Sequence, residues 1–560
     1  MAYERLGDLL MNIGLISHEE LDRALSLQKG SKKRLGDILT ENGFITEQQL
    51  IEALELQLGI EFIDLSKTVP PPEMAQVLSK NIARKYDVVP VRVDRDSIYL
   101  AMSDPLNFVA VEEVKTATRK RVVPMIATGE AVSRAIMTLY GNEGAARAIE
   151  DMKREARESD AAPVSSVSIL DGDVQSAPTV RLVNSIIERA VVERASDIHL
   201  EPQEGEVRVR MRIDGLLRNI LTVPKNLQSS VVSRLKVMGG MDIAERKVPQ
   251  DGRANITVRH GEVDLRMSTL PTIYGEKFVI RLLDKNVQLL DTAALGLAGL
   301  DLAKYNELMT AQSGVLLIVG PTGSGKSSTM YTMLRQLNTE QVNLVTLEDP
   351  VEYHLDGISQ VQINEKTGMT FSEGLRSILR QDPDIIAVGE IRDGETASIA
   401  MRAAITGHLV LSTVHTSNAA AAIDRLLDIG VEPYLIAGAL RGVISQRLVR
   451  RVCPQCRREY TPPEADLESL GLDGSHTFYH GVGCPMCFHT GYRGRTGVFE
   501  ILPIRRELRR GIADGLDRER LRALIGQSDF VSLADNCRRL VLEGVTTVGE
   551  ALRVINSADL

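Results

Sequence analysis

The sequence has no apolar run of the ~18 residues that a transmembrane helix needs, so we expect no membrane-spanning helix. The N-terminal stretch MAYERLGDLL has an early acidic residue and no apolar core, so we expect no secretory signal. An excess of basic residues is also missing, because the formal net charge is −9. Binding to a phosphate backbone needs a basic surface, so this balance argues against nucleic acid as the main partner. Tryptophan is absent, and nothing follows from that.

Cysteine is scarce, yet its placement is informative. Four of the five cysteines form two CxxC pairs, and the fifth, Cys537, stands alone. A cytosolic protein keeps its thiols reduced, so paired CxxC turns indicate a metal site rather than disulfides. The length of 560 residues suggests about three to four domains.

A tandem repeat opens the chain. Residues 5–28 read RLGDLLMNIGLISHEELDRALSLQ, and residues 34–57 read RLGDILTENGFITEQQLIEALELQ. Ser17 and Thr46 are N-cap candidates, each before an acidic first turn, and leucines then follow at helical spacing. Residues 1–141 are expected to form a repeat-bearing N-terminal domain, and the resemblance given below for the repeats implies that this domain is regulatory.

The composition divides the rest of the chain. Residues 142–177 are first charged and then rich in Ser, Ala and Pro, which is typical of a linker that has room for a short helix. Residues 178–290 contain a helical segment and alternating strands such as EVRVRMRI, which predict a smaller α/β domain. Residues 291–560 are expected to form the last and largest domain.

A nucleotide-binding motif lies in this last domain. GPTGSGKS fits the pattern GxxxxGK[ST], and it stands between an apolar strand, 315–319, and a helix-compatible run. Its backbone N–H groups and helix N-terminus can cradle phosphates, Lys326 can reach the β- and γ-phosphates, and Ser327 can bind Mg²⁺. The residues expected to bind nucleotide are Gly320, Pro321, Thr322, Gly323, Ser324, Gly325, Lys326 and Ser327.

Three further apolar segments end in polar residues, as strands of a parallel sheet do at its carboxyl edge. VNLVTL is followed by EDPVE, DIIAV by GEIRD, and GHLVLSTVHT carries His408 and His415. Among such acids, one can polarise the attacking water and another can organise Mg²⁺.

In this order, the four segments resemble the Walker A, Asp box, Walker B and His box of the secretion ATPase superfamily, with its GspE-type and PilB-type members. ASDIHLEP, RMRIDG and VPQDGR resemble the second N-terminal domain of that family. The resemblance implies a RecA-like domain in a hexameric ring that hydrolyses ATP. It also implies catalytic roles for Glu352, which activates water, for Glu390 of Walker B, and for His415.

The same resemblance implies that arginines of the second domain reach a γ-phosphate in the ring, and Arg266 and Arg281 stand at matching positions. Arginine suits this role because its charged fork contacts phosphate oxygens. The alternative is that these are ordinary arginines on a strand face.

The cysteine pairs are Cys453 with Cys456 and Cys484 with Cys487, in an insert at 450–490. Four thiolates can close one tetrahedral Zn²⁺ site with no open position, so the metal is expected to be structural. The family resemblance agrees with this prediction, because its assembly and secretion members carry a four-cysteine zinc element.

The paired repeats resemble MshE-type N-terminal domains, which bind cyclic di-GMP. Two copies of one motif could each hold half of this two-fold symmetric ligand, with Arg5, Gln28, Arg34 and Gln57 as the contacting residues. The alternative is a helical docking module whose leucines are core.

The sequence thus predicts a multidomain α/β ATPase that uses ATP, Mg²⁺ and Zn²⁺, and the resemblance of its repeats implies regulation by cyclic di-GMP. By resemblance, it would power type IV pilus or type II pseudopilus assembly from the cytoplasmic face of the inner membrane. Its partners would be an inner-membrane platform protein, other assembly or secretion proteins and copies of itself. A nucleic-acid motor is the remaining alternative from another class.

Overall fold

A computed structural model of the chain describes residues 6–29, 35–65, 68, 70–71, 73–160, 178–258, 261–284 and 292–557. These residues form two compact units, one chiefly of residues up to 282 and the other chiefly of residues from 283 onward. Within the described residues, no helix is both long and apolar enough to cross a membrane.

The tandem repeat folds as two pairs of helices. They are α1 (Leu6–Asn12), α2 (His18–Lys29), α3 (Leu35–Glu41) and α4 (Glu47–Leu58). Thr46 caps α4 in a reciprocal capping box, and Ser17 exchanges the equivalent hydrogen bonds with Glu20, as the sequence predicted. Leu10 and Leu39 are fully buried in the shared core. They are therefore packing residues of these four helices.

A small α/β fold follows the repeats. Its three-stranded sheet has the order β1-β2-β3, with β1 and β2 antiparallel and β2 and β3 parallel. The elements are α5 (Met74–Val77), α6 (Lys80–Tyr86), β1 (Val88–Val93), β2 (Ser97–Met102), α7 (Phe108–Thr118), β3 (Arg121–Ile126) and α8 (Gly129–Asp160). Helix α8 continues through residues 142–160, the first part of the expected linker, and residues 161–177 lie outside the described residues.

The second α/β domain is a six-stranded sheet of order β6-β5-β4-β9-β8-β7. Its elements are α9 (Pro178–Val192), β4 (Asp197–Pro202), β5 (Glu206–Ile213), β6 (Leu216–Pro224), α10 (Gln228–Gly239), β7 (Gln250–Val258), β8 (Gly261–Thr272) and β9 (Gly275–Asp284). Buried and more exposed residues alternate along β5, so one face of the strand packs against the core and the other stays partly open.

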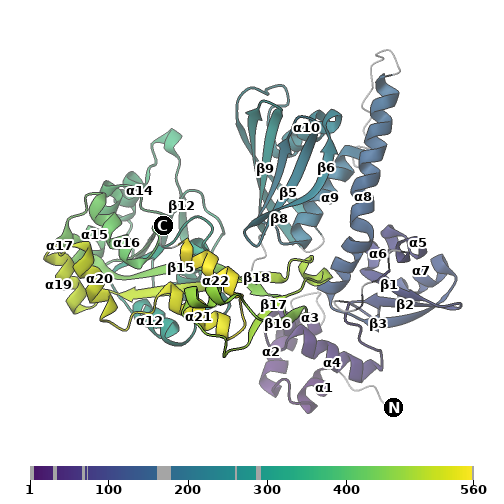
Figure 1. Ribbon diagram of the computed structural model, residues 1–560, viewed down its shortest axis with the longest axis horizontal. Helices are drawn as coiled ribbons and strands as arrows, with labels where there is room; N and C mark the ends of the chain where they lie inside the picture. The colour runs from purple at the N-terminus through teal and green to yellow at the C-terminus, as the bar shows by residue number, and fades with distance from the viewer. Residues whose placement is uncertain are drawn as a thin grey trace. The chain divides into compact units, whose positions relative to one another are not determined.

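The second unit is built on a seven-stranded sheet of order β12-β11-β13-β14-β10-β15-β18, drawn from teal to yellow in Figure 1. The strands are β10 (Gly314–Val319), β11 (Leu344–Glu348), β12 (Ser359–Gln362), β13 (Ile385–Val388), β14 (Leu409–Val414), β15 (Leu440–Val452) and β18 (Tyr492–Pro503). All pair in parallel except β18. Strand β14 lies between β10 and β13, which is the RecA-like order.

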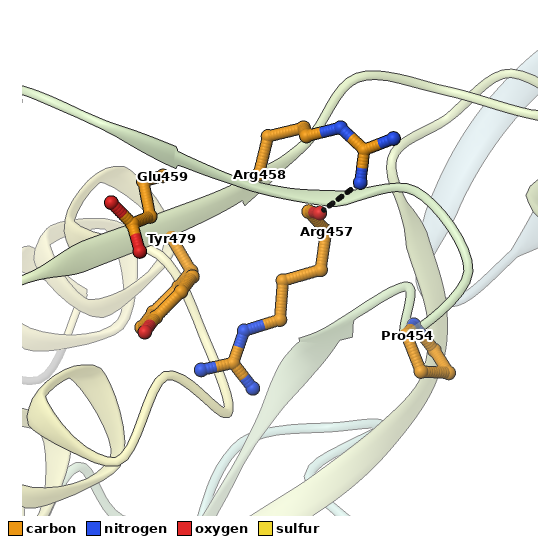
Figure 2. A pocket seen from close by; sticks show the side chains of 5 residues that line it. All are labelled: Pro454, Arg457, Arg458, Glu459 and Tyr479. Atoms are coloured by element: carbon orange, nitrogen blue, oxygen red, sulfur yellow. Dashed lines mark hydrogen bonds between the residues drawn. The ribbon is translucent and has the colours of Figure 1, made fainter.

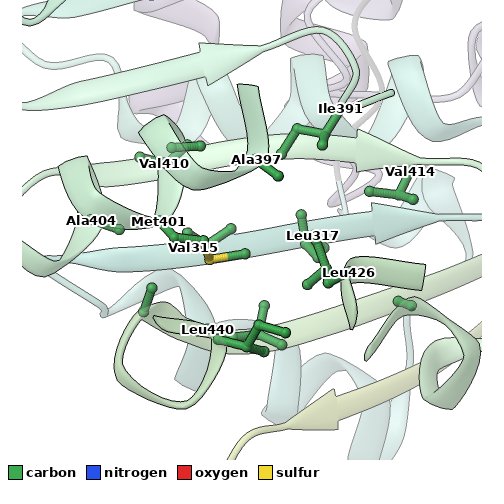
Figure 3. Close-up of a cluster of buried hydrophobic side chains, with 14 of the residues drawn as sticks. Val315, Leu317, Ile391, Ala397, Met401, Ala404, Val410, Val414, Leu426 and Leu440 are labelled. Atoms are coloured by element: carbon green, nitrogen blue, oxygen red, sulfur yellow. The ribbon is translucent and has the colours of Figure 1, made fainter. Parts of the chain in front are cut away.

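Helices cover both faces of this sheet, so every residue of β10 is buried. Val315 and Leu317 point into one core beside Met401 and Leu426 (Figure 3), while Leu316 and Ile318 point into the other. The helices are α11 (Thr292–Leu295), α12 (Gly299–Met309), α13 (Lys326–Leu337), α14 (Phe371–Ile378), α15 (Gly394–Ile405), α16 (Ala419–Asp428) and α17 (Pro433–Ala439).

The cysteine insert interrupts the chain between β15 and β18. It contains a two-stranded sheet and one short helix: β16 (Arg457–Tyr460), α18 (Glu464–Leu470) and β17 (Phe478–Gly481). The chain then ends in four helices, α19 (Arg506–Ala513), α20 (Arg518–Gly526), α21 (Leu533–Leu542) and α22 (Val548–Asn556).

Candidate active site

The glycine-rich loop joins β10 to the N-terminus of α13. A Cβ on Gly320 would lie 2.5 Å from the carbonyl oxygen of Gln446, so no other residue fits there without a shift. Gly325, with φ of 93°, directly precedes α13 and is crowded by the side chain of Gln446 in the same way. Strand β15, which carries Gln446, therefore sets the shape of the loop.

Lys326, the first residue of α13, is almost fully buried. Its amine donates hydrogen bonds to the carbonyl oxygens of Gly320 at 2.8 Å and Pro321 at 3.0 Å. Burial lowers the pKa of Lys326 to about 8, against the opposing attraction of Glu390. The loop thus holds its cation in a position where incoming phosphate oxygens could replace the carbonyl contacts.

A line of polar contacts joins the P-loop to the ends of β14 and β13. His415 Nδ1 lies 3.5 Å from the Lys326 amine, and His415 Nε2 lies 3.3 Å from a Glu390 carboxylate oxygen. Arg392 forms a close ion pair with the same carboxylate. Burial lowers the pKa of His415, so the neutral ring with its proton on Nε2 satisfies both neighbours. The structure therefore brings Lys326, Glu390 and His415 together at the carboxyl edge of the sheet.

The Asp box follows β11 and is fastened to α13 by a buried tyrosine. The Tyr331 hydroxyl accepts hydrogen bonds from the backbone N–H groups of Glu352 at 3.2 Å and Tyr353 at 3.3 Å. It donates to the carboxylate of Glu348, the last residue of β11. The half-buried Glu352 thus sits in a loop that is tied to the helix of the P-loop. Sequence reasoning did not identify Tyr331, which looked like one apolar position of a helix.

The loop has the donor groups that a nucleotide phosphate needs. The hydroxyl of Ser324 is buried and has no hydrogen-bond partner among the described residues. Pro321, Thr322, Gly323 and Ser327 are exposed or open, and the N-terminus of the 12-residue helix α13 adds a favourable dipole for an anion. These residues fit ATP, with the Ser327 hydroxyl available as a ligand for Mg²⁺.

His408, the other histidine of its box, lies outside this group. It precedes β14 at the amino edge of the sheet, and its Nδ1 lies 2.8 Å from the carbonyl oxygen of Ala403. His415 follows β14 at the carboxyl edge. A full strand therefore separates the two residues, and only His415 belongs to the site.

Arg266 and Arg281 lie in the second α/β domain on neighbouring strands, β8 and β9. Buried residues such as Leu265 and Ile280 alternate with them, so both arginines occupy the more open face of the sheet. Arg281 forms an ion pair with Asp197 at 3.0 Å, and its side chain remains 60% exposed. Their predicted role toward a neighbouring nucleotide remains a prediction.

The four paired cysteines converge. The Sγ atoms of Cys453, Cys456, Cys484 and Cys487 all lie within 4.8 Å of one another. Those of Cys484 and Cys487 are 3.7 Å apart, close to the ~3.8 Å edge of a tetrahedron with Zn–S bonds of ~2.3 Å. The backbone N–H of Gly483 donates to Cys456 Sγ at 3.3 Å. The set fits a closed structural Zn²⁺ site, whereas Cys537 is a buried core residue whose pKa burial raises to about 12.

A shallow cavity of about 620 Å³ lies beside the first cysteine pair (Figure 2). Its walls include Arg457 and Arg458, whose side chains point apart, together with Glu459 and Tyr479. The Arg457 guanidinium lies 3.6 Å from the centre of the Tyr479 ring. A Cβ on Gly544 would lie 2.2 Å from the same guanidinium, so this contact packs the cysteine insert against the turn before α22.

The repeat residues are only partly described. Arg5 and Arg34 lie outside the described residues, while Gln28 and Gln57 are half-buried at matching places in α2 and α4. The glycines of both RLG motifs have a packing reason. A Cβ on Gly7 would lie 2.8 Å from the Leu21 side chain, and one on Gly36 would lie 3.1 Å from Leu50. The two glycines therefore leave room for a leucine of the following helix.

Comparisons with known proteins agree with this architecture. The family model described as Type II/IV secretion system protein matches residues 173–553, and the MshEN domain model matches residues 58–146. The N-terminal region therefore has the expected domain type, although the match covers the residues that follow the tandem repeats.

Similar proteins come from both assembly and secretion systems. The type IV pilus assembly ATPase PilB of Myxococcus xanthus is 39% identical over 560 residues, 98% of each chain. Type II secretion system protein E of Pseudomonas aeruginosa is 44% identical over 467 residues, 82% of this chain and 92% of the relative. The PilB of Thermus thermophilus is 41% identical over 505 residues, 88% of this chain, but the chain spans only 56% of that relative.

Among solved structures, the ATPase DotB of Yersinia pseudotuberculosis has a TM-score of 0.53 at 20% identity, covering 71% of this chain and 97% of DotB. The likeness shows a shared fold, which is that of a P-loop ATPase. Family match, full-length relatives and site geometry agree: the chain belongs to the type II/IV secretion system protein family and is an ATPase of the type IV pilus assembly and type II secretion class.

Proposed function

We propose that this chain is the subunit of a hexameric ring that hydrolyses ATP to drive the assembly of pilin or pseudopilin subunits. The observation that carries the proposal is the convergence of the P-loop, Glu390 and His415 at the carboxyl edge of a RecA-like sheet. The relatives support both a pilus and a secretion system, since they carry either name. An inner-membrane platform protein would couple the ring to its product, and the ring would act on the inner face of that membrane.

The roles of the residues follow from their chemistry. Lys326 and the loop N–H groups bind the phosphates of ATP, and Ser327 with Glu390 holds Mg²⁺ and its waters. Glu352 accepts a proton from the attacking water, because a carboxylate beside the phosphates can act as general base. Arg266 and Arg281 stabilise negative charge on the γ-phosphate of ATP bound to a neighbouring subunit. Both lie on the more open face of their sheet, which suits this role.

Zinc and a cyclic dinucleotide complete the proposal. Zn²⁺ bound by the four cysteines holds the two CxxC turns of the insert together, since a two-stranded sheet and one short helix are only marginally stable on their own. Cyclic di-GMP binds the N-terminal region, a proposal supported by the MshEN match and by the repeated Arg and Gln positions.

Subunit mixing tests the shared site. Arg266→Ala and Glu352→Gln subunits should each be inactive, yet mixing them should restore ATPase activity. Some interfaces in mixed rings then combine an intact Glu352 with an intact Arg266 from the neighbouring subunit.

The control pairs Lys326→Ala with Glu352→Gln. Both residues belong to the same subunit, where Tyr331 ties the Glu352 loop to the helix that begins at Lys326, so mixing should restore nothing. No recovery in the first mixture, with subunit exchange demonstrated, would contradict a site shared between subunits. Equal recovery in the control would contradict it as well.

A further inference from the structure

We propose that Tyr331 is a positioning residue for ATP hydrolysis, and that its hydroxyl holds the Glu352 loop in register with the P-loop helix. The inference rests on the proposed role of Glu352 as the residue that activates water. Tyr331 does not itself have to touch nucleotide or water. It acts by fixing the backbone from which the Glu352 side chain extends.

The hydrogen bonds of Tyr331 use its full capacity. A phenol has one donor and two acceptor lone pairs, and this one donates to Glu348 and accepts from the N–H groups of Glu352 and Tyr353. The side chain is fully buried, so water cannot substitute for a lost partner. Burial, and next the hydrogen bond to Glu348, raise the pKa of Tyr331, so the hydroxyl keeps its proton and its direction of donation.

The partner of the hydroxyl is itself held rigidly. The buried Glu348 carboxylate accepts hydrogen bonds from Thr346 Oγ1 at 2.6 Å and Gln360 Nε2 at 3.1 Å. Gln360 also donates to the carbonyl oxygen of Tyr353 at 2.9 Å. The Tyr353 ring meets the Tyr331 ring edge-on, with centroids 5.4 Å apart. The loop after β11 is therefore fastened to α13, β11 and β12 together.

This arrangement has a consequence for the reaction. Helix α13 begins at Lys326, and Tyr331 is five positions further along the same helix. A displacement of helix α13 relative to the Glu352 loop would therefore bend or break the Tyr331 hydrogen bonds. A general base works only within hydrogen-bond reach of its water, so a loosened loop slows chemistry without weakening the phosphate contacts.

The test uses Tyr331→Phe in the full chain, because phenylalanine keeps the ring and removes only the hydroxyl. We expect kcat to fall about tenfold or more, since small misplacements of catalytic groups have effects of this size. The affinity for a non-hydrolysable ATP analogue should change less than about twofold, as its contacts lie in the P-loop. An unchanged kcat would overturn the proposal.

Tyr305→Phe is the matched control. Tyr305 is equally buried in the same domain, and its hydroxyl donates to Gln336 Oε1 at 2.9 Å, so the variant also loses one buried hydroxyl contact. It should lower thermal stability while leaving kcat near wild type. An equal loss of kcat in both variants would mean a general effect of destabilisation and would overturn the proposal.

A double-mutant cycle separates this inference from the role of Glu352. In a Glu352→Gln background, adding Tyr331→Phe should cost little more, because the loop no longer positions a base. If Glu352→Gln alone keeps normal turnover, the proposed base is wrong. If Glu352→Gln is inactive but Tyr331→Phe is fully active, only the positioning role is wrong.

Should Tyr331→Phe fail to fold, Gln360→Met carries the same test. This variant loosens the Glu352 loop from the β12 side, and a normal kcat there would overturn the proposal.

Discussion

At the scale of the residue, we expect the charge of Lys326 to control the affinity of the site for ATP. Lys326 is buried against the carbonyl oxygens of its own loop and beside His415. Burial lowers its pKa to about 8, so part of the population loses the positive charge in mildly alkaline solution. Negative phosphates beside the amine would raise this pKa again, which couples binding to proton uptake.

We therefore predict that ATP binding weakens as the pH rises through about 8. The protonated lysine binds phosphate, so affinity is full below the pKa of the free protein. It then falls by up to about tenfold per pH unit until the pKa of the complex is reached. Calorimetry with a non-hydrolysable analogue, from about pH 7 to pH 9.5, measures this dependence and the accompanying proton uptake. Lys326→Ala should bind weakly with no such slope, and a flat wild-type profile up to pH 9.5 would contradict the prediction.

The residues predicted from local sequence were those that occur in a fixed spacing. The glycine-rich loop, Glu390 and His415 stand directly at strand ends, where a parallel sheet gathers side chains at one edge. Tyr331 could not be predicted, because its partners come from β11 and the following loop, and its ring reads as ordinary helix core. Gly7 and Gly36 of the RLG repeats also have neighbours that local sequence does not indicate, since the side chains of Leu21 and Leu50 lie directly above them.

At the scale of the element, the cysteine insert gathers four thiols whose sulfur atoms lie within 4.8 Å of one another. Two CxxC turns approach each other, and a two-stranded sheet with one short helix lies between them in sequence.

A buried network of ion pairs joins β15, which precedes the insert, to α22. Burial alone would raise the pKa of Glu550, but hydrogen bonds from Arg553 and Arg450 outweigh this and lower the pKa to about 2.

Zinc analysis tests the structural role of the insert. Purified protein should contain about one Zn²⁺ per chain, because four thiolates close one site. Cys484→Ser should lower both the zinc content and the melting temperature, since metal binding contributes to folding energy. Cys537→Ala should leave zinc content unchanged, as Cys537 packs in the core of the C-terminal helices. A wild-type preparation that is free of metal and equally stable would contradict the assignment.

Element boundaries were predicted well where hydrophobic periodicity is strong, and less well where charge dominates. The strand predicted at EVRVRMRI is β5, residue for residue. By contrast, the charged composition of EGAARAIEDMKREARESD predicts a linker with room for a short helix only, whereas the segment continues the long helix α8 to Asp160. Its alanines and oppositely charged residues three and four apart favour a helix, even with little apolar surface to bury.

At the scale of the whole molecule, two units share one chain, and the sequence predicts their order but not their contacts. The RecA-like strand order places β14 between β10 and β13. These strands are far apart in sequence, so their order could be expected only from the family resemblance. The ring and the trans arginines involve other copies of the chain, so they remain proposals.

Ligand binding to the full chain tests the regulatory proposal. Cyclic di-GMP should bind saturably, and Arg5→Ala and Arg34→Ala should each weaken binding by ~1–3 kcal/mol, the scale of one bidentate guanine contact. Linear GMP should bind far worse, because it occupies one half-site only. If the messenger regulates hydrolysis through binding, nucleotide must in turn change messenger affinity. Absence of binding at high micromolar ligand, with the protein folded, would favour the docking-module alternative.

The central claim is that this chain hydrolyses ATP with Glu352 as the residue that activates water. Phosphate release by full-length Glu352→Gln, measured beside its affinity for ATP, tests that claim most directly. We predict that the variant binds ATP as tightly as wild type and hydrolyses it at least about a hundredfold more slowly, because only proton transfer is lost. Turnover close to wild type in this variant would contradict the account.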